Sequence, residues 1–167
     1  MAKSRARFPR RRCAPAALLG LIVPGLLGTP AAATTLCLTS ELKYTNKGAY
    51  DVGKLGIVWV DSGGTKQEKP YDMKRDDLHG DVLNHGDDWT FDLREIAPEL
   101  GIEQGDEVWL KVYIYAGETK SCRKDDHKLV YNGDAGVLMK FDTAGTTLND
   151  NSCKYAGDMS DDCYTGK

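Results

Sequence analysis

The sequence predicts an all-β protein, an antiparallel two-sheet β-sandwich stapled by disulfides. Short stretches in which apolar and polar residues alternate recur along the chain, separated by glycine-containing turns. No stretch with helical periodicity is long enough to form a layer of its own. The longest alternating stretch, residues 106–117, is expected to be an inner strand. Its two faces carry Val108, Leu110, Val112 and Ile114 on one side and Trp109, Lys111, Tyr113 and Tyr115 on the other.

Residues 1–33 have the features of a secretory signal peptide. Six Lys and Arg residues precede an apolar run from Ala14 to Leu27, and Ala31–Ala33 offers a cleavage site. The run is too short to cross a membrane. We therefore expect a secreted, extracellular protein with no transmembrane span in the mature chain. That chain would be a single domain, residues 34–167, with a cysteine-containing tail at 143–167.

The charge of the expected mature chain argues against two classes of partner. Loss of the signal peptide leaves 16 basic residues against 25 acidic residues, a formal charge of −9. Nucleic acid needs a basic surface to neutralise its phosphates, so no nucleic-acid partner is expected. The same excess of acid argues against simple electrostatic attachment to anionic membranes.

The cysteines predict two disulfides. Cys13 falls in the signal peptide, which leaves Cys37, Cys122, Cys153 and Cys163 in the exported domain. Three pairings exist. Because residues 153 and 163 close a short loop, we expect Cys153–Cys163, which leaves Cys37–Cys122. Structural zinc would need close Cys-x-x-Cys spacing, which the sequence lacks.

The first half of the domain is expected to hold three strands. Alternation over residues 36–44 gives the first strand, and residues 55–60 give the second. A glycine turn then leads into residues 65–73, a polar strand that Pro70 places at a sheet edge. Residues 74–86 are polar and irregular.

The second half continues the same pattern around the long inner strand. A short strand is expected at 89–93, followed by a helical turn at 94–100. After the inner strand, residues 117–128 read as a charged loop. Residues 128–131 and 136–142 then predict a hairpin, because they flank an Asn-Gly-Asp-Ala turn.

The order of these motifs resembles a known family. Gly48-Ala49-Tyr50 precedes the strand with Trp59, the strands at 89–93 and 108–115 follow, and Gly145-Thr146-Thr147-Leu148 comes near the end. This series is similar to the C-terminal membrane-binding β-sandwich of the cholesterol-dependent (thiol-activated) cytolysins. The resemblance implies two antiparallel sheets whose loops at one end meet the membrane.

The resemblance also implies site residues. In that family a threonine–leucine pair contacts sterol, and Thr147 and Leu148 stand at the matching positions, with Ala49 in a neighbouring tip loop. The family's tryptophan-rich loop would fall at residues 117–127, where this chain has charges and no tryptophan. Inserting those charges into lipid would cost several kcal/mol each. Pore formation is therefore not expected, and the polar tip favours a glycan or protein ligand over a membrane sterol.

The His–Asp pairs and the aspartate-rich turns could bind metal ions or could be ordinary solvated loops. The pairs His79/Asp81 and His85/Asp87 could gather an ion, but a solvated polar loop is favoured. Aspartates outnumber glutamates 18 to 7 and many adjoin Gly or Asn, which suits calcium. Aspartate is also typical of turns. We therefore expect no metal and no cofactor, with calcium as the alternative.

No catalytic constellation stands out, since no histidine lies near a serine or cysteine nucleophile signature. Carboxylates are abundant, but nothing selects one pair. Trp109, Tyr113 and Tyr115 could form a stacking platform for sugars, although packing in or under the core is favoured.

The sequence thus predicts a non-catalytic, lectin-like binding module for a cell-surface glycan, protein or membrane sterol. Its ligand surface would be formed by loops 46–50, 84–88, 117–127 and 145–148. The alternatives are a small secreted hydrolase with a carboxylate or His79/His85 site, and a disulfide-stapled inhibitor that presents loop 117–127. The candidate ligand-binding residues are Ala49, Tyr50, Asp87, Asp88, Thr147 and Leu148.

Overall fold

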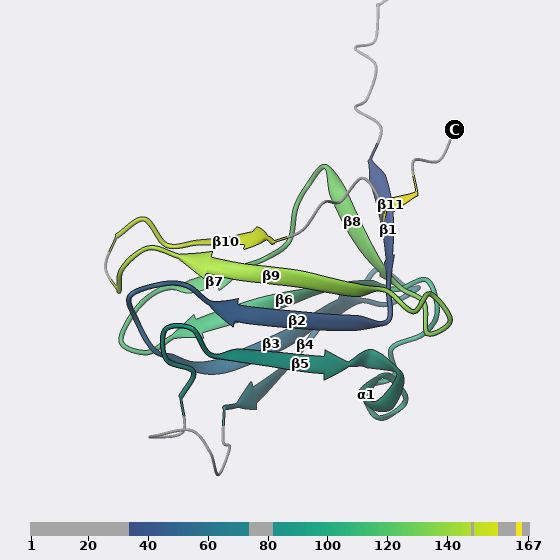
Figure 1. Ribbon diagram of the computed structural model, residues 1–167. Helices are drawn as coiled ribbons and strands as arrows, with labels where there is room; N and C mark the ends of the chain where they lie inside the picture. Colours follow the sequence, from purple (N-terminus) through teal and green to yellow (C-terminus); the bar gives the residue numbers. More distant parts are fainter. Residues whose placement is uncertain (1–33, 74–81, 148, 157–162, 165–167) are drawn as a thin grey trace, which may run out of the picture. The chain divides into compact units, whose positions relative to one another are not determined.

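The computed structural model describes residues 34–73, 82–147, 149–156 and 163–164, so the predicted signal peptide lies outside the described residues. Two sheets share one hydrophobic core, which confirms the all-β class (Figure 1). The larger sheet has the order β11 (Cys163–Tyr164), β1 (Thr35–Thr39), β8 (His127–Tyr131), β6 (Glu107–Ile114), β3 (Val52–Val60) and β4 (Lys66–Asp72), with β7 (Thr119–Ser121) paired to β6. The smaller sheet has the order β10 (Ser152–Tyr155), β9 (Leu138–Ala144), β2 (Glu41–Asn46) and β5 (Asp88–Asp92).

Strand β6 occupies the inner position that its alternation predicted. It lies between β8 and β3, and Val108, Leu110 and Val112 have no exposed surface. On the outer face Trp109 is only 3% exposed, because the cationic groups of Lys66 and Arg123 lie 5.5 and 5.1 Å from its ring centre. The packing interpretation is therefore right for Trp109.

The antiparallel prediction is only partly right, because both sheets are mixed. Strands β1 and β8 pair in parallel, and so do β2 and β9. The predicted single strand 36–44 breaks at Ser40 into β1 and β2, which belong to different sheets. The predicted hairpin of 128–131 with 136–142 is likewise wrong, since β8 and β9 also lie in different sheets.

The wrong strand and hairpin predictions are explained by two places where the chain crosses from one sheet to the other, which hydrogen bonds hold together. The chain passes from the large sheet to the small one at Ser40 and again at residues 132–137. The Ser40 N–H donates to the Val137 carbonyl oxygen over 3.0 Å, and the Asn132 N–H donates to the Thr39 carbonyl over 2.9 Å. The two crossings therefore satisfy each other's backbone groups away from either sheet.

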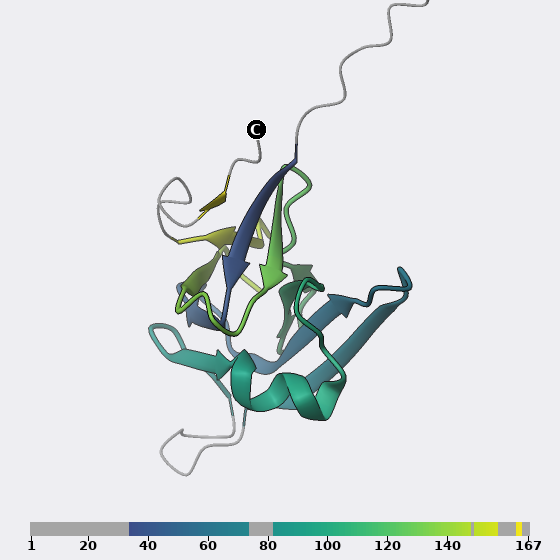
Figure 2. The same cartoon turned by 90° about the vertical axis from the view of Figure 1, so that its right-hand side faces the viewer.

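The remaining elements follow their local sequence. Strand β4 is the edge strand that its polar composition and proline predicted. Helix α1 (Leu93–Leu100) begins at Asp92, whose side chain accepts from the Arg94 N–H, and ends at Gly101 with φ 69°. Figure 2 faces the end of the sandwich at which α1 lies. Residues 117–127 are not simply a loop, because β7 pairs back onto β6.

The disulfides are Cys37–Cys163 and Cys122–Cys153, so both predicted pairings are wrong. Strand β11 pairs with β1, and that register sets Cys37 directly opposite Cys163. The Cα atoms are 4.0 Å apart in this pair and 4.9 Å apart in the other. Proximity in the sequence misled the prediction, because sheet pairing determines which cysteines meet.

Candidate functional site

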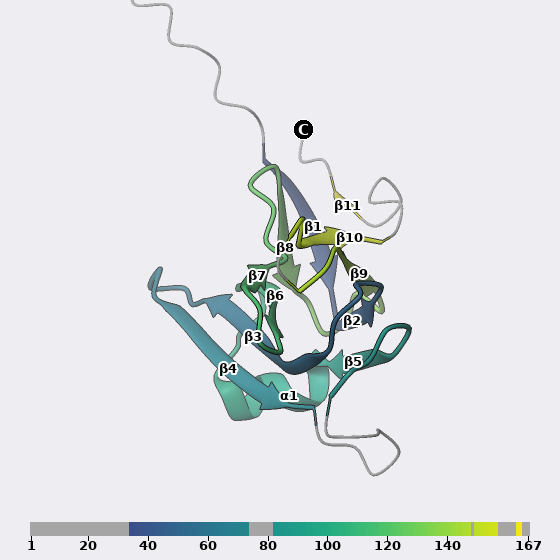
Figure 3. The same ribbon diagram turned by 90° about the vertical axis from the view of Figure 1, so that its left-hand side faces the viewer.

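Several connections between strands meet at the end of the sandwich opposite α1, the end that Figure 3 faces. The Ala49 N–H donates to the Gly145 carbonyl oxygen over 2.9 Å, which joins the β2–β3 and β9–β10 connections. Val52 and Leu83 exchange two backbone hydrogen bonds of 2.9 Å. The Tyr115 N–H donates to the Asp51 carbonyl oxygen over 2.8 Å. Backbone hydrogen bonds thus hold four separate segments together.

This arrangement agrees with the predicted loop surface in part. Loops 46–50 and 84–88 are brought together with the described residues of 145–148. Of residues 117–127 only the beginning takes part: a Cβ on Gly117 would lie 2.9 Å from the Thr147 carbonyl oxygen. The rest of that segment runs along β6 to the disulfide at Cys122.

Asn46, at the end of β2, organises the gathered segments from within. Its side chain is completely buried, and its amide nitrogen donates to the carbonyl oxygens of Tyr50 and Leu83 over 2.6 and 3.0 Å. Its amide oxygen accepts from the Gly48 N–H over 3.0 Å. One side chain therefore bridges the β2–β3 connection and the segment before β5.

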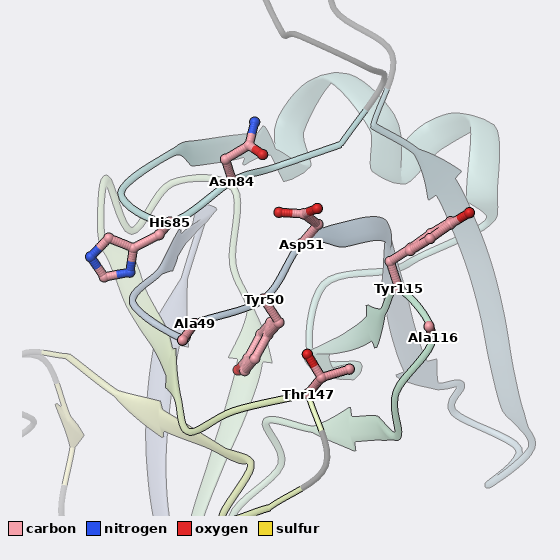
Figure 4. Close-up of a pocket in the computed structure, with 8 residues that line it drawn as sticks. All are labelled: Ala49, Tyr50, Asp51, Asn84, His85, Tyr115, Ala116 and Thr147. Atoms are coloured by element: carbon pink, nitrogen blue, oxygen red, sulfur yellow. The ribbon is translucent and has the colours of Figure 1, made fainter.

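The gathered segments enclose an open depression of about 600 Å³, which we call the loop depression (Figure 4). Tyr50 forms part of its floor and is only 6% exposed, and burial raises the pKa of its phenol. Tyr115 stands on the rim and is 68% exposed. The lining residues are Ala49, Tyr50, Asp51, Asn84, His85, Tyr115, Ala116 and Thr147.

Two lysines close to the loop depression, Lys47 and Lys120, are each bonded to a carboxylate. Lys47 Nζ lies 2.6 Å from Asp142 Oδ2. Lys120 is bonded to Glu118, and this bond lowers the pKa of the Glu118 carboxyl. Asp51 is exposed and forms no ion pair with another described residue. The loop depression therefore presents one carboxylate beside other polar and aromatic groups.

His85 is held by one ring nitrogen. Its Nδ1 lies 3.1 Å from the Gly48 carbonyl oxygen, which fits an Nδ1–H donor. The second nitrogen, Nε2, is then the one left for another partner. His79 and Asp81 lie outside the described residues, so the first of the two predicted His–Asp pairs is not described.

The predicted site residues divide into three groups. Ala49, Tyr50 and Thr147 line the loop depression, whereas Leu148 lies outside the described residues. Asp87 and Asp88 do not line it. The Asp87 carboxylate accepts from the Asn84 N–H over 2.7 Å, and Asp88 pairs with a lysine of β2 at 2.7 Å. Both are bound within the fold.

Sequence reasoning missed Asp51 as a site residue and named Tyr115 only in the less favoured alternative, a stacking platform for sugars. Tyr115 was assigned to the outer face of the inner strand, but β6 ends at Ile114. Ala116, which follows Tyr115, adopts φ 54°, an uncommon conformation for a residue other than glycine, and Tyr115 itself is exposed to solvent. Gly117 was read as the end of this strand, but the strand already ends at Ile114.

Two features of the described residues concern metal binding and hydrolysis. Among the described residues, no three His, Cys, Asp or Glu side chains gather closely enough to hold a metal ion. The described lining of the loop depression contains the carboxylate of Asp51 and no second one. Hydrolysis by a carboxylate pair needs two. In the described part of the chain, no helix is long and apolar enough to cross a membrane.

No protein-family model matches the sequence, and no curated protein matches it. Solved structures of cytolysins do match. Pneumolysin of Streptococcus pneumoniae gives a TM-score of 0.34 at 13% identity, over 70% of this chain and 23% of pneumolysin. Its isolated membrane-binding domain gives 0.33 at 15% identity, over 71% of this chain and 96% of the domain. Listeriolysin O gives 0.34 at 12% identity, over 71% of this chain and 22% of that protein.

The chain thus spans about a quarter of the length of the whole cytolysins that it matches. The resemblance to the cytolysin membrane-binding domain, predicted from the order of motifs, is confirmed by these matches. The identities and scores are low, and the matches carry no information about ligand or activity.

Proposed function

We propose that the protein is a secreted, non-catalytic binding module that recognises a cell-surface glycan in the loop depression. The observation that carries this proposal is Tyr115, a large aromatic side chain 68% exposed on the rim of a depression lined by polar groups. A single exposed aliphatic side chain is ordinary, but an exposed ring beside a concave surface is typical of a recognition site.

The chemistry of the lining suits a sugar. The apolar face of a pyranose ring can stack on a tyrosine ring, while its hydroxyl groups both donate and accept hydrogen bonds. Asp51 supplies acceptors, Asn84 supplies a donor and an acceptor, and Thr147 supplies a hydroxyl. The rigid backbone bond between Asp51 and Tyr115 lowers the entropic cost of presenting both groups together.

The same lining makes a sterol a poorer ligand. Burying the Asp51 carboxylate under an apolar ring system would remove it from water without a compensating partner, which is costly. Secretion is supported by two disulfides, which persist in oxidising compartments, together with the predicted signal peptide.

A glycan array probed with the mature protein, residues 34–167, tests the proposal. Glycans bound on the array are then titrated against Tyr115→Ala and Tyr115→Phe. We expect at least a tenfold loss of affinity for the alanine variant, about 1.4 kcal/mol, and near-normal affinity for the phenylalanine variant. The control is Leu38→Ala, which removes another exposed side chain on β1, outside the loop depression.

A stability control and two binding outcomes decide how the array is interpreted. Because Tyr115 is exposed, Tyr115→Ala should leave the free energy of unfolding within about 0.5 kcal/mol of the wild type. Binding only to cholesterol-containing liposomes, and to no glycan, would replace the glycan with a sterol. Glycan binding that survives Tyr115→Ala unchanged would remove the loop depression as the site.

A further inference from the structure

We infer that the glycan recognised by the loop depression carries a positive charge, as in oligosaccharides of glucosamine with free amino groups, and that Asp51 receives an ammonium group. This inference rests on the proposed function, because it specifies the ligand of the same site. Its evidence is the charge of the depression, the position of Asp51 beside Tyr115, and the engagement of the surrounding lysines.

Asp51 is the formally charged residue of the described lining. Its side chain is exposed, and no described lysine or arginine forms an ion pair with it. The nearby lysines, Lys47 and Lys120, are bonded to Asp142 and Glu118. A ligand entering the depression therefore meets a carboxylate that no lysine or arginine in the described part of the chain pairs with, which favours a cation and disfavours a sulfated or sialylated glycan.

The position of Asp51 relative to Tyr115 suits an oligosaccharide. The backbone bond of 2.8 Å between these residues fixes the starting points of both side chains, and both line the same depression, with the Tyr115 ring pointing away from the Asp51 carboxylate (Figure 4). An aromatic face attracts cations as well as the C–H groups of a sugar. An oligosaccharide of amino sugars presents a stacking face and an ammonium group on every unit, so adjacent units could contact the two side chains.

Other residues that line the loop depression can bind the hydroxyl groups of a sugar. Asn84 and His85 come from the segment before β5, and Thr147 comes from the β9–β10 connection. With His85 Nδ1 directed to a backbone carbonyl, its Nε2 is left to bond a sugar hydroxyl. These groups would bind any pyranose, whereas Asp51 would distinguish the amino sugar.

The test uses three hexasaccharides of equal length, made of glucose, N-acetylglucosamine or glucosamine. Binding to the mature protein is measured by calorimetry at low salt, at a pH where the amino groups of the glucosamine hexamer are protonated. We expect this hexamer to bind about tenfold more tightly than either neutral hexamer. The preference should weaken as salt is added, because the charges are exposed.

Two variants separate a local contact from general electrostatics. Asp51→Asn should abolish the preference for the glucosamine hexamer, so that this variant binds the glucosamine hexamer no more tightly than it binds the neutral hexamers. Asp134→Asn makes the same charge change in the β8–β9 connection, outside the loop depression, and should leave the preference intact. Equal loss in both variants would overturn the inference.

The remaining outcomes distinguish the inference from the proposed function. Equal affinity for all three hexamers would leave a glycan-binding module and overturn the positive charge of its ligand. Binding on the array to other glycans, with none to the glucosamine hexamer, would do the same. Failure to bind any glycan would overturn both.

Discussion

The amide nitrogen of Asn46 donates to the carbonyl oxygen of Tyr50 over 2.6 Å, from a side chain with no exposed surface. The same nitrogen donates to Leu83 over 3.0 Å. These bonds fix the backbone at the floor of the loop depression. The side chain that forms them is buried, so no ligand touches it. The stability of the fold and the shape of the candidate site are therefore coupled at Asn46.

Asn46→Ala should lower the free energy of unfolding by about 2–4 kcal/mol, because it leaves buried backbone groups without their partner. The loss should be accompanied by weaker ligand binding, since Tyr50 would no longer be held. Denaturant unfolding measures the first effect and titration with an array-identified glycan measures the second. Asn149→Ala, in an exposed part of the β9–β10 connection, is the control and should remain within about 0.5 kcal/mol of the wild type. A stable Asn46→Ala variant would contradict this role.

The two disulfides should contribute unequally. Cys37–Cys163 spans 126 residues and Cys122–Cys153 spans 31. Loop-closure entropy then predicts losses of about 5 and about 4 kcal/mol when each pair is replaced by serine. Thermal unfolding of the two double variants, without reductant, gives the order. A larger loss for the short-range pair would show that native-state contacts outweigh chain entropy.

Some of the fold could be predicted from the sequence because it depends on neighbouring residues. Alternation over residues 106–117 predicted the inner strand β6, and proline with polar residues predicted the edge strand β4. The break at Ser40 could not be predicted in this way. Ser40 bonds to Val137, 97 residues away, and alternation of apolar residues continues through the break. The same limit applies to Cys37 and Cys163, which meet through strand pairing.

The candidate site shows the same division. The turns around Ala49 and Thr147 were predicted as ligand loops, and both line the loop depression. Asp87 was predicted as a site residue because its loop was expected to lie beside the other end loops, and its carboxylate accepts from the Asn84 N–H within its own turn. Tyr115 was placed on the inner strand because the turn at Ala116 uses a residue with no preference for positive φ.

Gly145 is expected to be essential for the shape of the β9–β10 connection. Its φ is 113°, and a Cβ there would lie 2.5 Å from the Asp150 carbonyl oxygen. Gly145→Ala should therefore lower the free energy of unfolding by about 1–3 kcal/mol and displace Thr147 from the loop depression. Gly64→Ala is the matched control, because Gly64 also has positive φ (79°) but its Cβ would meet nothing within 4 Å. Equal losses of stability in both variants would show that the positive φ causes the effect and that the close approach to Asp150 does not.

The last prediction concerns the phenol of Tyr44, which is fully buried and lies 2.6 Å from the hydroxyl of Thr143. Thr143 donates in turn toward the amide oxygen of Asn46 over 3.5 Å, so the phenol is the donor at the start of a chain of hydrogen bonds. Burial raises the pKa of Tyr44 well above its usual value near 10, and the bond with Thr143 opposes this rise only in part.

The pH dependence follows from proton binding. Above about pH 10 the unfolded chain loses the Tyr44 proton while the folded chain keeps it, so the folded state binds more protons. The free energy of unfolding should then fall by about 1.4 kcal/mol per pH unit for this residue. Tyr44→Phe should make the fall shallower by that amount, at a cost of about 1 kcal/mol at neutral pH. Leu38→Ala, which removes an exposed side chain without an ionisable group, should leave the slope of the wild type, as measured by denaturant unfolding at several alkaline pH values. An unchanged slope in Tyr44→Phe would mean that the phenol ionises in the folded protein. The hydrogen bonds that link Tyr44 to Asn46 through Thr143 would then not depend on the phenol proton.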